Sequence, residues 1–139
     1  MTPAEETLAD LWATGTFGTH PVAHAREALT ARGVLRASDL ASPAKAAANS
    51  VVMVAGLVTH RQRPPAARGV VFISLEDETG VANVICPPDV WARYGPVAGQ
   101  APALVVSGRV ERASGAVSLI ASALRPLRVA AKVPSRDFR

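Results

Sequence analysis

Three side chains on two neighbouring predicted strands are of types that bind nucleic-acid bases. In residues 70–76, VVFISLE, Phe72 and Ser74 share one side of a two-residue alternation, and the aliphatic side chains between them share the other. After an acidic turn that ends at Gly80, the next run places Asn83 on the same outward side. A phenyl ring can stack on a base, and a hydroxyl and an amide can bind base edges. The alternative, that Phe72 only covers a hydrophobic patch beneath a loop or a helix, stays open.

Basic side chains surround this pair of strands. The predicted loop over residues 60–69, HRQRPPAARG, is stiffened by two prolines, and two further arginines lie in a later strand. The residues expected to contact phosphates are His60, Arg61, Arg63, Arg68, Arg109 and Arg112. A base stacked on one aromatic ring contributes about 1 to 3 kcal/mol, and phosphate contacts weaken with salt. With one stacking platform, we expect weak, salt-dependent binding of single strands with little sequence preference.

The net charge of +4 is unevenly distributed. Residues 1–50 contain four basic and five acidic side chains, whereas residues 51–139 contain eleven basic and six acidic ones. A basic surplus confined to the strand-rich part favours a polyanionic partner, and nucleic acid is the leading candidate. The alternative is an ordinary solvated basic surface.

The elements that position these residues follow from periodicity. Short helices are expected over residues 7–13 and 22–32, the second ended by Gly33, and the stretch 40–50, LASPAKAAANS, is typical of a linker. Strands are expected over residues 51–61, 70–76, 81–86, 103–113 and 116–127, with a short helix within 87–99. This order predicts a mainly β chain, a five-stranded OB-fold Greek-key barrel with a helix between strands 3 and 4, preceded by a small helical segment. Gly56 and Gly108 fall where such a barrel bends. The predicted domains are 1–49 (helical segment and linker), 50–128 (barrel) and 129–139 (tail).

Composition limits the kind of protein. Hydrophobic residues make up 49% of the chain and no apolar run has the length of a membrane span, so we expect a globular, cytoplasmic protein with no membrane contact. The single cysteine, Cys86, cannot form an internal disulfide and is expected to be buried. Trp12, Trp91 and Tyr94 lie at helical spacings among apolar residues and are expected to pack in the core.

Sites for metal chemistry are weak. His20 and His24 have a spacing that can bind zinc on a helix, but no glutamate follows the first histidine and Pro21 places it at the helix start. The aspartates are scattered, and the acidic run 76–78 is expected to be a solvated turn. We therefore expect no catalytic residue, no metal and no cofactor in this chain.

Residues 51–95, VVMVAGLVTHRQRPPAARGVVFISLEDETGVANVICPPDVWARYG, closely resemble the C-terminal barrel of bacterial error-prone DNA polymerases, which are relatives of the polymerase III alpha subunit. The likeness continues to Leu127, and both the closing SRDFR and residues 8–29 are similar to that family. A more distant likeness connects the hairpin to the anticodon-binding barrel of class II aminoacyl-tRNA synthetases. There an outward aromatic residue and a polar residue eleven positions later contact bases, which implies this role for Phe72 and Asn83.

The resemblance implies single-stranded DNA binding by a non-catalytic segment of a translesion polymerase. The palm, fingers and phosphoesterase-like domains of that family are not in this sequence, so the chain alone is not expected to be an enzyme. Two alternatives remain: a barrel that docks onto other translesion or replication proteins through its basic loop, and a free-standing barrel that binds RNA or tRNA.

Overall fold

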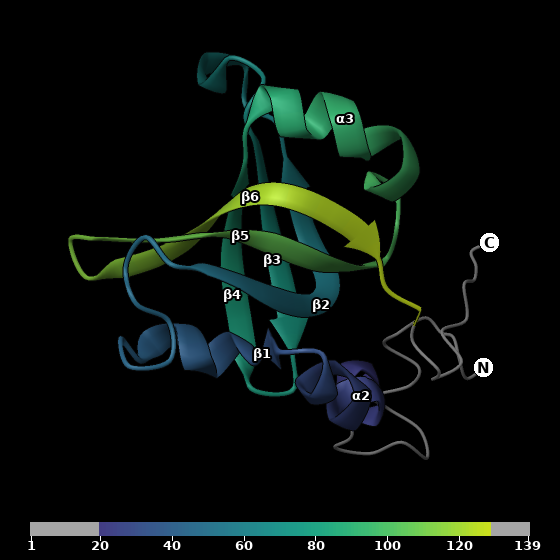
Figure 1. Ribbon diagram of the computed structural model, residues 1–139. Helices are drawn as coiled ribbons and strands as arrows, with labels where there is room; N and C mark the ends of the chain where they lie inside the picture. Colours follow the sequence, from purple (N-terminus) through teal and green to yellow (C-terminus); the bar gives the residue numbers. More distant parts are fainter. Residues whose placement is uncertain (1–19, 129–139) are drawn as a thin grey trace.

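The computed structural model describes residues 20–128, and they form a closed five-stranded barrel with short helices (Figure 1). The barrel strands are β2 (Val51–Gln62), β3 (Val71–Asp77), β4 (Gly80–Cys86), β5 (Ala103–Ala113) and β6 (Ala116–Pro126). Four antiparallel pairings and one short parallel pairing, between β4 and β6, close the barrel. With α3 (Pro88–Ala98) between β4 and β5, this is the predicted OB-fold order. The predicted helix over residues 7–13, Trp12, the tail 129–139 and the motif SRDFR lie outside the described residues.

Glycines allow two strands to bend sharply. The first half of β2 pairs with β5 and its second half pairs with β3. Gly56 lies near this change of partner, where an added Cβ atom would come within 2.9 Å of the Glu76 backbone and the Leu75 Cβ. At Gly108, an added Cβ would lie 2.5 Å from the Ile120 carbonyl oxygen, beside a shift in the β5–β6 register. Both glycines are therefore needed for close backbone approach, as the barrel prediction expected.

The barrel interior is filled by the aliphatic side chains of alternating strand positions. Its largest fully buried members include Val54, Val71, Ile73, Leu75, Leu104, Val106 and Leu119. Trp91 and Tyr94 of α3 pack against this core, as predicted. Cys86 is also buried, and burial raises the pKa of its thiol to about 11. None of the helices within residues 20–128 combines the length and the apolar character needed to cross a membrane.

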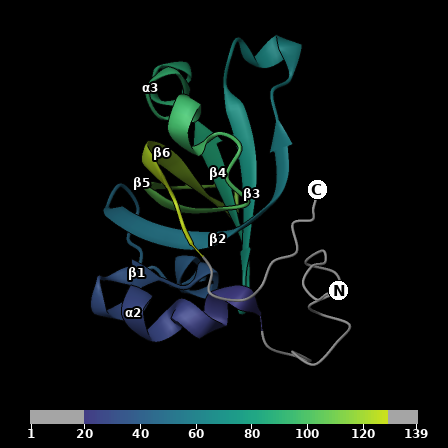
Figure 2. The ribbon, with the colours of Figure 1, turned by 90° about the vertical axis from the view of Figure 1, so that its right-hand side faces the viewer.

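The N-terminal elements pack on the barrel. They are the 3-10 helix η1 (Pro21–Ala25), α2 (Arg26–Ala31), the two-residue strand β1 (Val34–Leu35) and the 3-10 helix η2 (Ala37–Ala41). Val22, Leu29 and Val34 form a second hydrophobic cluster with outer-face residues of β2 and β5. Figures 1 and 2 show these elements on the opposite side of the barrel from α3. Gly33, with a φ of 81°, ends α2 as predicted, whereas the parallel pairing of β1 with β2 was not predicted.

Residues 40–50, predicted to be a linker, are mostly exposed but pack on the barrel at two points. Leu40 and Ala46 are 4% and 0% exposed, and both belong to the same core cluster as the barrel. The Arg112 guanidinium donates hydrogen bonds to the carbonyl oxygens of Leu40 at 2.7 Å and Ala46 at 2.6 Å. The small residues of this stretch therefore permit close packing, and the domain boundary at residues 49 and 50 stays a prediction.

The expectation of a solvated acidic turn is also wrong. Asp77 is 3% exposed, and its carboxylate accepts hydrogen bonds from the backbone nitrogens of Ala37, at 2.8 Å, and Thr79, at 2.8 Å. The Arg26 guanidinium bridges Asp77 at 3.2 Å and Glu78 at 2.7 Å. The turn between β3 and β4 is thus the attachment point for α2 and η2.

Candidate nucleic-acid interface

Two rows of side chains cross the outward face of β2, β3 and β4. Each row contains one residue from each strand, and its members are directly opposed in the antiparallel register. The rows are His60, Ser74 and Asn83, then Gln62, Phe72 and Ile85. Opposed residues on antiparallel strands have Cβ atoms about 4.5 to 5.5 Å apart. The six side chains therefore form one continuous surface, which we call the base face.

The base face is exposed where a ligand would contact it. Phe72 is 38% exposed, although large hydrophobic side chains of the barrel are mostly buried. His60, Gln62 and Asn83 are also exposed, while Ser74 and Ile85 are partly buried. The predicted outward orientation of Phe72, Ser74 and Asn83 is confirmed. An aromatic ring flanked by amide and hydroxyl groups can stack on a base and bind its edge.

A bulge in β2 determines which of its residues reach this face. The β2–β3 register shifts between Val58 and His60, so Thr59 has no partner in the ladder. The Thr59 hydroxyl donates a hydrogen bond to the Ser74 carbonyl oxygen at 3.4 Å. One extra residue reverses the alternation that follows it, so His60 is outward and Arg61 lies opposite the core residue Ile73.

The N-terminal segment limits the base face at one end. Beyond the first row, Glu76 of β3 lies next to His20, whose Nε2 is 3.3 Å from the carboxylate. Burial lowers the pKa of His20, and the hydrogen bond with Glu76 opposes that shift. His20 also accepts a hydrogen bond from the Val22 backbone nitrogen at 3.1 Å and so caps η1. His20, the first histidine of the pair whose spacing was considered for zinc and judged weak, is therefore a capping residue at this border.

The connection between β2 and β3 limits the other end. It contains the 3-10 helix η3 (Pro65–Ala67), and it extends beyond the barrel beside α3 (Figure 2). Gly69 lies there against Pro88, the first residue of α3. A Cβ atom added to Gly69 would be 3.4 Å from the Pro88 ring. Arg63 and Arg68 are exposed on this connection, and neither forms an ion pair or a hydrogen bond with another side chain of residues 20–128. Both guanidinium groups are therefore available to phosphates.

The other three predicted arginines have different positions. Arg61 donates a hydrogen bond to the Ala101 carbonyl oxygen at 3.0 Å, and burial lowers its pKa. Arg109 lies on β5 and donates to the Asn49 side chain at 3.2 Å, and Arg112 holds residues 40–46 through two carbonyl oxygens. The structure brings Phe72, Ser74, Asn83 and His60 together in the two rows, and Arg63 and Arg68 lie on the connection next to them. Arg61, Arg109 and Arg112 are not in the rows.

Gln62 and Ile85 are members of the base face that the sequence did not reveal. Gln62 lies opposite Phe72 only because of the bulge, which has no clear sequence signal. Ile85 follows Asn83 by two residues in the alternation of β4, so its outward position could have been found from the pattern.

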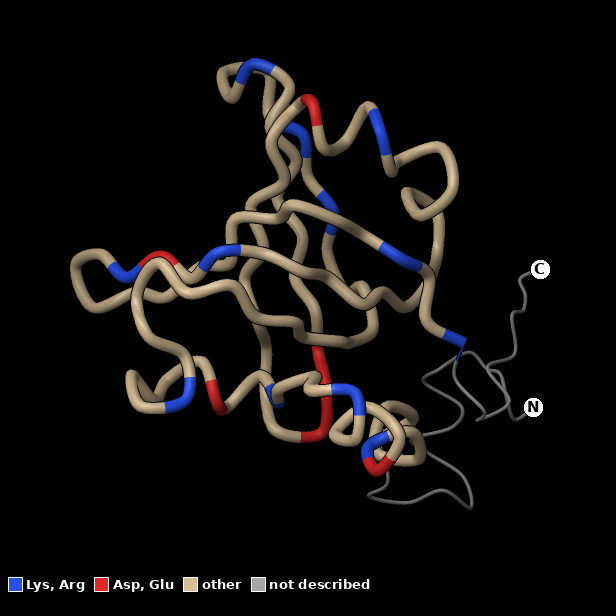
Figure 3. The backbone as a smooth tube through the Cα atoms, in the orientation of Figure 1, with Lys and Arg blue, Asp and Glu red and all other residues tan. Residues whose placement is uncertain are grey.

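Figure 3 shows the charges around this face: basic positions lie on the β2–β3 connection, and acidic positions gather at the β3–β4 turn at the other end. Because Arg26 and His20 lie against these acidic side chains, part of the negative charge is compensated locally. A polyanion is thus attracted toward the end that carries Arg63 and Arg68.

The fold is that of an OB-fold nucleic acid binding domain. Residues 52–127 match the family model of that description, and the chain belongs to this family. A putative aspartyl-tRNA synthetase from Leishmania major Friedlin has the same fold, with 12% identity, a TM-score of 0.54, and coverage of 71% of this chain and 21% of that one.

The particular proteins to which this chain is similar include error-prone DNA polymerases. It is 47% identical over 140 residues to that of Mycobacterium bovis, covering 100% of this chain and 13% of the relative. It is 45% identical to that of Nocardia farcinica, covering 100% of this chain and 12% of the relative. The predicted resemblance to the C-terminal barrel of such polymerases is confirmed. The whole chain thus spans only about 13% of the Mycobacterium bovis relative, and its residues 52–127 are the OB-fold domain.

Proposed function

We propose that this chain binds single-stranded DNA on the base face, as a non-catalytic part of an error-prone DNA polymerase. The observation that carries the proposal is the half-exposed Phe72 between polar residues of two rows. Single exposed apolar side chains are ordinary on protein surfaces, so the support comes from the position of the ring beside the polar side chains of both rows and not from its exposure alone.

The geometry supports a simple mode of binding. A base stacks on Phe72, and the polar groups of Gln62 and Asn83, on either side of the ring, reach base edges or sugars. The phosphates on one side of that base are directed toward Arg63 and Arg68. Since the site has one stacking platform, its affinity depends strongly on salt, and sequence preference is small.

The similarity to error-prone polymerases supports a role in guiding DNA. Such a barrel holds the single-stranded template near a polymerase active site during synthesis across lesions, in the cytoplasm of a bacterial cell. In this role the domain contributes binding and orientation, and chemistry takes place elsewhere in the enzyme.

Titration of a fluorescent single-stranded DNA with the protein and with Phe72→Ala tests the proposal. We expect about 5-fold to 150-fold weaker binding in the variant, because one stacked base contributes about 1 to 3 kcal/mol. The control is Val97→Ala, which removes an exposed apolar side chain of α3 that belongs to neither row of the base face. A thermal melt of each variant verifies that the fold is intact.

Equal DNA affinity of Phe72→Ala and the unaltered protein would contradict the proposal. Competition with an RNA oligomer of the same sequence separates DNA from RNA: RNA that competes better than DNA identifies an RNA-binding barrel instead. Absence of binding to either, even at low salt, favours a barrel that docks onto other proteins.

A further inference from the structure

A second surface, separate from the base face, lies between α2 and the barrel. It is a hollow of about 350 Å³, within the range of about 300 to 1,000 Å³ that is usual for ligand pockets. Its apolar floor comes from α2, β1, β2, β5 and the chain after β6: Leu29, Val34, Met53, Val105 and Leu127. Leu29 and Val34 are buried, while the other three are partly exposed.

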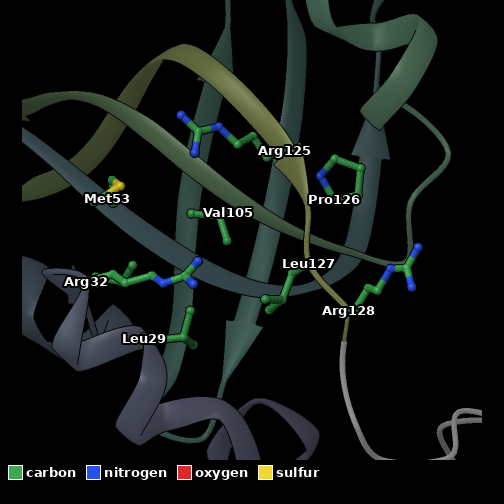
Figure 4. Close-up of a pocket in the computed structure, with 9 residues that line it drawn as sticks. Leu29, Arg32, Met53, Val105, Arg125, Pro126, Leu127 and Arg128 are labelled. Atoms are coloured by element: carbon green, nitrogen blue, oxygen red, sulfur yellow. The ribbon is translucent and has the colours of Figure 1, made fainter.

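Three arginines line the same hollow. Arg32 follows α2, Arg125 is on β6, and Arg128 follows β6. Figure 4 shows Arg32 and Arg125 approaching from two elements with Val105 between them in the view, and Arg128 next to Leu127. All three are exposed, and within residues 20–128 none of them forms an ion pair or a hydrogen bond through its side chain.

Four other arginines in the described part of the chain already have polar partners, whereas these three, like Arg63 and Arg68, have none. Arg26, Arg61, Arg109 and Arg112 are each bonded to a carboxylate, an amide or a carbonyl oxygen. No acidic residue is among the described residues that line the hollow, so none of the lining residues compensates the charge of these three arginines. Such a set of guanidinium groups around an aliphatic floor is complementary to carboxylates that flank apolar side chains.

We propose that this hollow binds an acidic peptide segment of a partner protein, in which aspartate or glutamate alternates with large apolar residues. The apolar side chains fill the floor and the carboxylates pair with Arg32, Arg125 and Arg128. A peptide fits better than nucleic acid because the described lining has no aromatic side chain on which a base could stack. The peptide site is independent of the base face and does not rest on its function.

The test uses the full chain and a short fluorescein-labelled peptide in which Asp and Glu alternate with Leu and Phe. We expect saturable binding, weakened about tenfold or more in Arg32→Glu/Arg125→Glu, since two attractive contacts become repulsive. A peptide with Asn and Gln in place of the acids is expected to bind far more weakly. The matched control is Arg63→Glu/Arg68→Glu, which changes the net charge equally but at the base face, and it is expected to leave peptide binding unchanged.

Three results would overturn the inference. If Arg32→Glu/Arg125→Glu and Arg63→Glu/Arg68→Glu reduce peptide binding equally, the peptide is attracted only by the overall charge of the protein. If Arg32→Glu/Arg125→Glu abolishes single-stranded DNA binding and the peptide does not bind, the hollow is a nucleic-acid contact. If the peptide binds only after Leu8→Asp/Leu11→Asp, which alters the acidic, apolar residues 5–12 of this chain, the occupant is the chain's own segment and not a partner.

Discussion

Asn83 lies one row from Phe72 on the neighbouring strand, so it can contact a base that is stacked on the ring. We expect Asn83→Ala to weaken single-stranded DNA binding by about twofold to tenfold, the range of about 0.5 to 1.5 kcal/mol for one hydrogen bond. Titrations with homopolymers of different bases measure this effect, and differences among bases should become smaller. Val81→Ala, an exposed change on the same strand, is the control. If Asn83→Ala binds each homopolymer as tightly as the unaltered protein does, Asn83 has no role in base contact.

The arginines separate into those free to bind phosphates and those with structural partners. Arg63→Gln is expected to weaken DNA binding and to lower the slope of log K against log salt by about 0.7 for one lost phosphate contact. Arg112→Gln removes a donor from the Leu40 and Ala46 carbonyl oxygens, so it should lower the melting temperature and leave the slope unchanged. Salt titrations and thermal melts of both variants give the comparison. A lower slope for Arg112→Gln than for Arg63→Gln would reverse this assignment.

At the residue scale, the sequence was sufficient where alternation alone decides orientation. Phe72, Ser74 and Asn83 were predicted outward because β3 and β4 keep a regular two-residue period. Orientation could not be derived for the end of β2, since the bulge at Thr59 exchanges the sides of His60 and Arg61. Partners of arginines depend on contacts between distant segments, which a single sequence does not reveal.

At the scale of elements, the acidic β3–β4 turn holds the N-terminal segment through Arg26. Arg26→Ala leaves the buried Asp77 carboxylate without its cation, and such changes cost about 3 to 5 kcal/mol. We therefore expect a large fall in the free energy of unfolding, measured by urea denaturation. Arg32→Ala, at the end of the same helix but exposed, should change it little. A similar small effect for both variants would show that the segment is held by its apolar contacts alone.

The same contact predicts a dependence of stability on pH. The hydrogen bond from Arg26 lowers the pKa of Glu78, so the folded protein binds a proton at this group more weakly than the unfolded chain. The stabilisation is complete above the unfolded pKa, near 4.5, and is lost as the pH falls through the lower folded value. In thermal melts between neutral and acidic pH, the melting temperature of Glu78→Gln should fall less on acidification than that of the unaltered protein. An identical fall of the melting temperature in both proteins would mean that other carboxylates cause the loss of stability in acid.

Element order was predictable because strand and helix periods are local, whereas the attachment of residues 20–49 was not. A stretch rich in Ala, Pro and Ser is compatible with a linker, yet Ala46 is fully buried here. The acidic run 76–78 was interpreted as solvated because its cation, Arg26, is about fifty residues earlier in the chain. Charge compensation across such a separation becomes visible only when the fold is known.

At the scale of the whole molecule, the base face and the hollow lie on different parts of the barrel. β2 contributes His60 to one and Met53 to the other, and the path between them along the strand, which bends at Gly56, is about 20 Å. The N-terminal elements pack on the outer face of β2 between these positions through Leu57 and Ala55. Arg63 and Arg68 next to the base face and Arg125 and Arg128 at the hollow are four of the eleven basic residues in positions 51–139.

Two separate basic surfaces predict that DNA and an acidic peptide bind together. At physiological ionic strength the Debye length is about 8 Å, so neutralising the hollow should change the DNA dissociation constant by less than about twofold. At 0.01 M salt the Debye length is about 30 Å, and the bound peptide should then weaken DNA binding. Anisotropy titrations of labelled DNA, with and without saturating unlabelled peptide, measure both conditions. Competition that persists undiminished at physiological salt would require a shared site, because screened charges at this separation cannot produce it.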